Sequence, residues 1–133
     1  MKKLNEAGKG KLSILILMLI FTIIIIYNRF SSTSLSKHFI VTNGIVKEVG
    51  FAAKSDGYTN YTFIINGKPF NGSQGLPHFK NLESRSVIVN KIFPVIVDST
   101  NYSNNSMLFD SLSFVLYGLK YPDSLVWLKQ YLK

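Results

Sequence analysis

The sequence predicts a mostly β domain, a small barrel with a helical segment at its C-terminal end, preceded by one N-terminal transmembrane helix. Three features predict this arrangement. The first is an uncharged apolar run over Leu12–Tyr27. The second is an alternating run over Tyr58–Ile65 that leads into Asn66-Gly67, and the third is a change to helical spacing after Asp110.

The apolar run Leu12–Tyr27 is sixteen residues long, and only one serine and one threonine in it are polar. Sixteen helical residues rise about 24 Å, whereas a bilayer core is about 30 Å thick. Extending the run to Phe30 adds Arg29, whose guanidinium can reach the lipid headgroups. We therefore expect residues 12–30 to form a transmembrane helix in contact with the lipid bilayer.

A cleaved signal peptide is the alternative, because a charged tip followed by an apolar stretch is also typical of such peptides. Ser32 and Ser34 offer small residues for a cleavage site. The apolar part of a signal peptide usually has about 7–15 residues, whereas this run is longer, β-branched and followed by Arg29. We expect an anchor that is not cleaved. A bacterial lipid anchor is excluded because the chain has no cysteine.

Basic residues are unevenly distributed around this helix. Four lysines and one acid precede the run, and Arg29 and Lys37 follow it. The positive-inside rule then makes residues 1–11 a cytoplasmic tip, 31–37 a polar tether and 38–133 an extracytoplasmic domain. We expect a single-pass protein of an inner (cytoplasmic) membrane with its N-terminus in the cytoplasm.

Composition limits what the outer part does. Residues 31–133 carry ten Lys/Arg and six Asp/Glu, an excess of +4 without a basic stripe, so we expect no nucleic-acid partner. An aromatic platform for single strands would consist of Tyr58, Tyr61, Phe63 and Phe70, and core packing is the simpler assignment for Tyr61 and Phe63. The lack of cysteine excludes disulfides and thiolate sites, and a disulfide-free outer domain fits a bacterial envelope.

The clearest local prediction is a β-hairpin. Tyr58–Ile65 alternates apolar and polar residues, and Asn66-Gly67 is the preferred sequence of a type I′ turn. Pro69 in the returning strand lacks an N–H, which predicts an edge strand. Before the hairpin, Phe39–Val49 is a β-branched strand, and Gly44 within it predicts a bulge or a close backbone approach.

The second half of the domain is less regular. Ser86–Asn90 and Ile92–Val97 are predicted strands, and the second is apolar on both faces, as in a closed barrel or under a helix. Asp98–Ser106 is predicted to be a turn-rich loop, and Met107–Phe109 a short last strand.

The C-terminal segment follows helical spacing. Asp110 or Ser111 can cap a short helix over Leu112–Tyr117, which ends at Gly118. Asp123 is the expected N-cap of a second helix. The apolar face of that helix is expected to pack on the sheet; its members are Leu125, Leu128 and Leu132. The alternative is a candidate interaction surface, formed by Trp127, Leu128 and Tyr131.

We expect no catalytic, cofactor or metal site, and therefore no enzyme. His38 and His78 have no second histidine or acid at helical spacing. The outer carboxylates occur in turns, caps or exposed strand positions, where short acids have structural roles. The chain has no Gly-x-Ser-x-Gly elbow, and Asn71–Gly75 does not match a phosphate-binding loop.

The outer part resembles a group of small single-pass bacterial membrane proteins of unknown function. The residues that carry this resemblance are Gly44, Val46, Tyr61, Phe63, Ile65, Asn66, Gly67, Lys68, Phe70 and Gly72, with Pro122-Asp123-Ser124-Leu125 and Trp127 in the tail. The resemblance implies a small SH3- or OB-like barrel. It implies no activity and no site residues.

Three functions remain open. The first is a non-catalytic, membrane-anchored extracytoplasmic interaction module, for example an accessory or immunity-type protein of a bacterial envelope. The second is a domain that binds an envelope glycan or peptide, which a groove lined by Tyr and Trp would favour. The third is an enzyme, which clustered acids or histidines in a cleft would favour.

Overall fold

The computed structural model describes the backbone of residues 6–51 and 56–133, and the side chains of residues 12–27, 35–51 and 56–133. Contacts divide the chain into two compact units, Met1–Ser34 and Leu35–Lys133.

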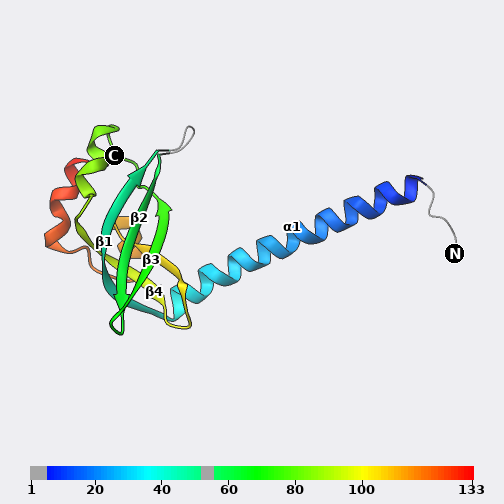
Figure 1. Cartoon of the computed structure of the whole chain (residues 1–133), viewed down its shortest axis with the longest axis horizontal. Helices are drawn as coiled ribbons and strands as arrows, with labels where there is room; N and C mark the ends of the chain where they lie inside the picture. The colour runs from blue at the N-terminus through cyan, green and yellow to red at the C-terminus, as the bar shows by residue number, and fades with distance from the viewer. Residues whose placement is uncertain (1–5, 52–55) are drawn as a thin grey trace. The chain divides into compact units, whose positions relative to one another are not determined.

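The first unit is occupied by helix α1, which runs from Glu6 to Lys37 and ends within the second unit (Figure 1). The large apolar side chains over Leu12–Tyr27 are 50–70% exposed. Within the described residues, none of the helices combines the length and the apolar character needed to cross a membrane. The segment 31–37, expected to be a tether, is part of α1, and Leu35 is buried in the core of the second unit.

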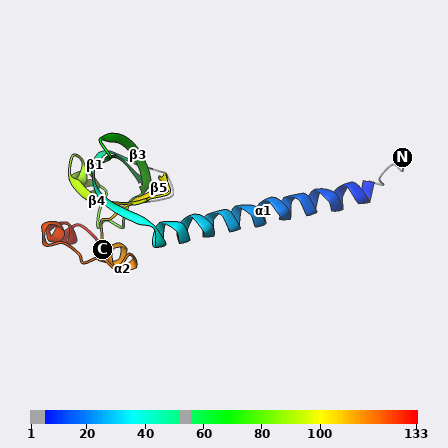
Figure 2. The same ribbon diagram turned by 90° about the horizontal axis from the view of Figure 1, so that it is seen from below.

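The second unit is a five-stranded, barrel-like antiparallel sheet, which confirms the mostly β prediction. The strands are β1 (Phe39–Gly50), β2 (Tyr58–Ile65), β3 (Lys68–Gly75), β4 (Ile92–Asp98) and β5 (Asn101–Met107). Their order in the sheet is β3-β2-β1-β4-β5. Strand β1 pairs with β4 through its first half and with β2 through its second half. Figure 2 shows the strands curving around until β3 and β5 face each other.

The close approach predicted at Gly44 is confirmed. Gly44 pairs with β2 on one side and β4 on the other, and a Cβ there would lie 2.6 Å from Val95 Cγ2. The ladder with β2 shifts register between Val46 and Glu48. The irregularity of β1 therefore lies shortly after the glycine, where the strand leaves β4 and continues along β2.

The hairpin prediction is also confirmed. Ile65 pairs with Lys68, and the two residues between them have positive φ, 52° at Asn66 and 76° at Gly67, as a type I′ turn requires. Strand β3 lies at one end of the strand order, so the edge position predicted from Pro69 is correct.

Side chains rather than a backbone ladder close the gap between β3 and β5. Each neighbouring pair is antiparallel, so in a five-stranded barrel the two end strands run parallel. The Gln74 amide acts as a substitute peptide group: its Nε2 donates to Met107 O at 2.8 Å and its Oε1 accepts from Met107 N at 2.6 Å. Tyr61 Oη donates to Asn105 Oδ1 at 2.8 Å beside it.

The strand predicted over Ser86–Asn90 is wrong. This segment belongs largely to a 3-10 helix, η1 (Glu83–Ile88). Asn81 Oδ1 accepts from Ser84 N at 2.8 Å and starts the helical turn. Arg85 and Ile88, three residues apart, are then both buried, a spacing that suits a 3-10 helix rather than a strand.

The loop predicted over Asp98–Ser106 is also wrong, because β5 occupies most of it and ends where the last strand was expected to begin. Only Met107 among its residues is buried. Some of its polar side chains make local bonds, such as Asn105 Nδ2 to Tyr102 O at 2.9 Å, and others bond to distant strands, such as Ser106 Oγ to Gln74 Oε1 at 3.2 Å. An edge strand of this composition lacks the apolar alternation by which strands are recognised.

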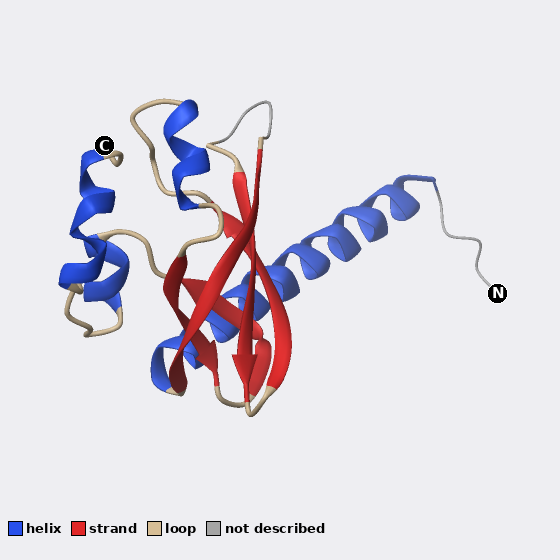
Figure 3. Cartoon of the chain, turned by 60° about the vertical axis from the view of Figure 1, so that its left-hand side comes forward, coloured by secondary structure: helices blue, strands red, loops and turns tan. Residues whose placement is uncertain are grey.

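The C-terminal helices lie beside the strands together with η1 (Figures 1 and 3). Helix α2 (Ser111–Leu116) begins as predicted, because Asp110 Oδ1 accepts from Ser113 N at 2.8 Å. The second segment is a 3-10 helix, η2 (Asp123–Gln130).

Pro122 rather than Asp123 is the N-cap of η2, and no side chain caps it, so the Asp123 assignment is wrong. Leu125 and Leu128 are buried in the core and Leu132 packs against it, which confirms the packing prediction.

Candidate functional site

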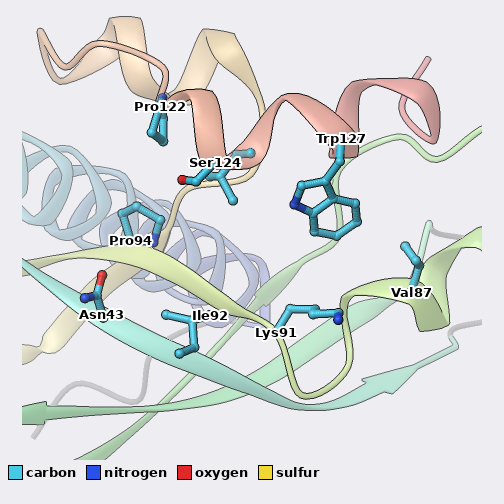
Figure 4. Close-up of a pocket in the computed structure, with 9 residues that line it drawn as sticks. Asn43, Val87, Lys91, Ile92, Pro94, Pro122, Ser124 and Trp127 are labelled. Atoms are coloured by element: carbon cyan, nitrogen blue, oxygen red, sulfur yellow. The ribbon is translucent and has the colours of Figure 1, made fainter.

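A groove of about 640 Å³ lies between η2 and the outer face of β1 and β4 (Figure 4). Strand β4 and the turn before it supply its floor, and η2 supplies its wall. The lining residues are Asn43, Val87, Lys91, Ile92, Pro94, Pro122, Ser124, Leu125 and Trp127. We refer to this site as the Trp127 groove.

The floor consists of side chains that the alternation of the strands directs outward. Asn43 pairs with Pro94, and Ile45 pairs with Ile92. Paired residues share a face of the sheet, and the intervening Phe93 is fully buried in the core. Ile92 is 59% exposed, and Ile45 extends the apolar surface beyond the groove.

Trp127 is held in place by other aromatic rings. Its ring centroid lies 6.4 Å from that of Phe93 and 6.2 Å from that of Tyr131. Phe93 is itself packed edge-on against Phe109, with centroids 4.8 Å apart. An aromatic ring supported in this way loses little conformational freedom when it binds a partner, which is a property of interface anchors.

Lys91 is positioned by a tight turn between η1 and β4. Its N–H donates to Ile88 O at 3.0 Å, and its carbonyl accepts from Val46 N at 3.1 Å. Asn90, the preceding residue, has a φ of +62°, a conformation that few non-glycine residues adopt. These hydrogen bonds hold the backbone of Lys91, whose side chain lines the groove.

The polar groups of the groove are mainly donors without protein partners. Over the part of the chain that the structure describes, Lys91 Nζ, Trp127 Nε1, Ser124 Oγ and the Asn43 amide make no hydrogen bond or ion pair. Lysine and tryptophan side chains donate only. The groove therefore suits a ligand that presents acceptors together with apolar surface.

The three residues that the sequence suggested as an interaction surface, Trp127, Leu128 and Tyr131, occupy different positions relative to the groove. Trp127 lines the groove, and Tyr131 supports it from the side. Leu128 is 0% exposed, so it lies beneath the surface that it was expected to help form. Lys91 and Pro94 were not identified from the sequence, because strand and turn positions that are far from Trp127 in the chain gave no sign of facing it.

The histidines and acids have structural surroundings. Nδ1 of the exposed His78 contacts Oδ2 of Asp56, and Oδ1 of Asp56 lies 3.6 Å from the guanidinium of the buried Arg85. Asp98 Oδ1 accepts from Thr100 N at 2.9 Å in the turn after β4. Among the described residues, no three His, Cys, Asp or Glu side chains are grouped closely enough to hold a metal ion.

Two of the four aromatic residues considered as a platform for single strands are buried, whereas Tyr58 is 39% exposed. Tyr61 and Phe63 are each 1% exposed and belong to the core, as the simpler assignment predicted. Burial raises the pKa of Tyr61 above its usual range, and a hydrogen bond to the backbone of Met107 partly opposes this effect.

No protein-family model, curated protein or solved structure matches this chain.

Proposed function

We propose that the protein is a membrane-anchored, non-catalytic extracytoplasmic module that binds another protein through the Trp127 groove. The observation that carries the proposal is the groove itself, in which a supported aromatic ring faces an exposed apolar floor. Aromatic anchors in pockets dominate the energy of many protein interfaces. An accessory or immunity-type role in a bacterial envelope is consistent with such a module.

The apolar floor is part of a wider exposed apolar surface, which supports a protein partner. Val41 and Ile45 on β1 and Ile64 on β2 are exposed in addition to Ile92. Contiguous apolar side chains on a soluble face usually mark an interaction site. A partner protein can cover this area, whereas a small molecule in the groove would leave most of it in water.

The anchoring role of α1 rests on its exposed apolar side chains over Leu12–Tyr27. Thr22 Oγ1 donates to Met18 O at 2.8 Å, so this hydroxyl would enter a bilayer with its hydrogen bond already made. Nineteen helical residues over 12–30 rise about 28 Å, close to the roughly 30 Å of a bilayer core. The lysines before this segment favour an extracytoplasmic second unit.

Of the two barrel types expected, we infer the OB-like one. The five strands, the partly open β3–β5 gap and the helical turn of η1 between β3 and β4 support it, since the OB-fold is a five-stranded, partly open barrel. This inference concerns the fold alone, because unrelated functions occur on the same barrel.

An envelope glycan is the second candidate ligand. Trp127 and Ser124, which both line the groove, favour it, because sugar rings stack on aromatic faces and their hydroxyls need hydrogen-bonding partners. The mostly aliphatic floor and the neighbouring exposed apolar residues favour the protein partner.

The proposal is tested by affinity capture from detergent-solubilised membranes with the tagged full-length protein as bait. We expect a protein that copurifies with the wild type and with Val126→Ala but is lost with Trp127→Ala. Val126 lies beside Trp127 in η2 and is 50% exposed, which makes it a matched control. Equal capture by all three baits would contradict the role of the groove, provided that thermal melts show Trp127→Ala to be folded.

A further inference from the structure

We propose that the Trp127 groove binds an extended acidic segment of its partner, in which a carboxylate lies next to apolar side chains. The carboxylate pairs with Lys91, and the apolar side chains pack on Trp127, Ile92 and the two prolines of the lining. This inference rests on the proposed protein-binding function and specifies the chemistry of the bound segment.

The charge of the lining selects an anion. Within the part of the chain that the structure describes, Lys91 is the one charged residue that lines the groove. Among the described residues, the charged side-chain contacts are those of Asp56 with His78 and Arg85, and Lys91 forms no ion pair. A carboxylate brought by the partner would form an ion pair with Lys91, and charge-assisted bonds of this kind are the stronger ones.

Among the described residues, no acid lines the groove. Asp123, in the first turn of η2, is close in sequence to Ser124 but does not line the groove. Glu48 on β1 accepts from Asn60 Nδ2 at 3.2 Å, on the β2 side of the strand. The ammonium group of Lys91 is therefore available to pair with an acidic ligand. The excess of +4 over residues 31–133 also favours binding of an acidic partner.

The apolar part of the lining suits an extended chain. As seen in Figure 4, Trp127 and Lys91 lie toward one end of the groove, and Pro94, Pro122 and Asn43 lie toward the other. An acidic side chain and an apolar one, a few residues apart in a partner segment, can thus be bound at the same time. The amide of Asn43 and the hydroxyl of Ser124 remain for backbone groups of that segment.

The probe is a library of random-sequence peptides displayed on phage, selected on the full-length protein in detergent micelles. Three baits are compared: the wild type, Lys91→Glu and Lys68→Glu. Lys68 is exposed at the start of β3 and lies outside the groove, so its replacement changes the net charge equally. We expect the wild type and Lys68→Glu to enrich peptides with Asp or Glu near Leu, Ile, Pro or aromatic residues, and Lys91→Glu to lose this preference for acids.

Binding of one enriched peptide gives a second readout. We expect Lys91→Gln to weaken it about fivefold to tenfold, the effect of roughly 1–1.4 kcal/mol, and added salt to weaken wild-type binding in the same direction. No enrichment on any bait, enrichment that does not change with Lys91→Glu, or binding of neutral glycans in place of peptides would overturn the inference. If affinity capture depends on Trp127 but not on Lys91, the proposed protein-binding function is supported and the acidic character of the bound segment is rejected.

Discussion

At the scale of single residues, Tyr61 links the core to the pH dependence of stability. Its hydroxyl bonds to Asn105 in β5 from inside the barrel, and burial raises its pKa in the folded state. An unfolded tyrosine has a pKa of about 10. Stability due to the neutral hydroxyl is therefore present below about pH 10 and is lost as the pH rises further, because the unfolded chain then binds fewer protons.

The Tyr61→Phe variant isolates this effect. At neutral pH we expect it to be less stable than the wild type by about 0.5–1.5 kcal/mol, since one hydrogen bond is lost. As the pH rises above about 10, the difference between the two proteins should shrink, because only the wild type loses stability through this group. Urea unfolding followed by the fluorescence of the single tryptophan measures both curves. A difference that stays constant or widens with pH would contradict the assignment.

At the scale of elements, η2 directs neighbouring apolar residues into different surroundings, one into the core and one into solvent. Leu128 is fully buried, and Val126, two residues earlier, is 50% exposed. We expect Leu128→Ala to lower the free energy of unfolding by about 2–5 kcal/mol, and Val126→Ala to change it by less than about 0.5 kcal/mol. Denaturant midpoints of the two variants measure this. An unshifted midpoint for Leu128→Ala would mean that η2 does not cover the core.

The Gln74 side chain joins β3 to β5 through its hydrogen bonds to Met107. Gln74→Ala leaves the Met107 N–H without its partner, and we expect a loss of roughly 1–3 kcal/mol, the cost of an unsatisfied buried donor. Ser73→Ala on the neighbouring exposed position should be near neutral. Hydrogen exchange of the Met107 amide should become faster in Gln74→Ala. Unchanged exchange would show that the gap is closed by other groups.

Elements with a strong local signal could be predicted from the sequence, and those defined by distant partners could not. The hairpin at Asn66-Gly67 and the Asp110 cap depend on residues within a few positions of each other. By contrast, η1 is helical because Arg85 and Ile88 meet the core, and β5 is a strand because β4 and Gln74 supply its hydrogen bonds. Neither cause is visible in the local composition.

The same limit applies to the groove. Trp127 was a candidate because it flanks the leucine face of the C-terminal helix, whereas Lys91 and Pro94 became part of the site only through the packing of η2 on β4. A proline directed outward from a strand that is otherwise apolar on both faces was the one signal that could have indicated an uncovered surface there.

At the scale of the whole molecule, the lysine distribution around α1 predicts the orientation of the chain. A reporter enzyme that is active only outside the cytoplasm, fused after Lys133, should be active, and a cytoplasmic reporter at the same place should be inactive. The N-terminal sequence of the purified protein should be that of the full chain. The opposite reporter pattern would overturn the orientation, and an N-terminus near Leu35 would identify a cleaved signal peptide.

The central claim is that the Trp127 groove holds a partner protein, and photocrosslinking in cells tests it most directly. A photoreactive amino acid replaces either Ser124, which lines the groove, or Ser73, which is exposed on β3 outside it. We expect a specific adduct of higher mass from position 124 that disappears when Trp127→Ala is added, and no such adduct from position 73. Equal adducts from both positions, or none from position 124 in cells that contain the folded protein, would contradict the claim.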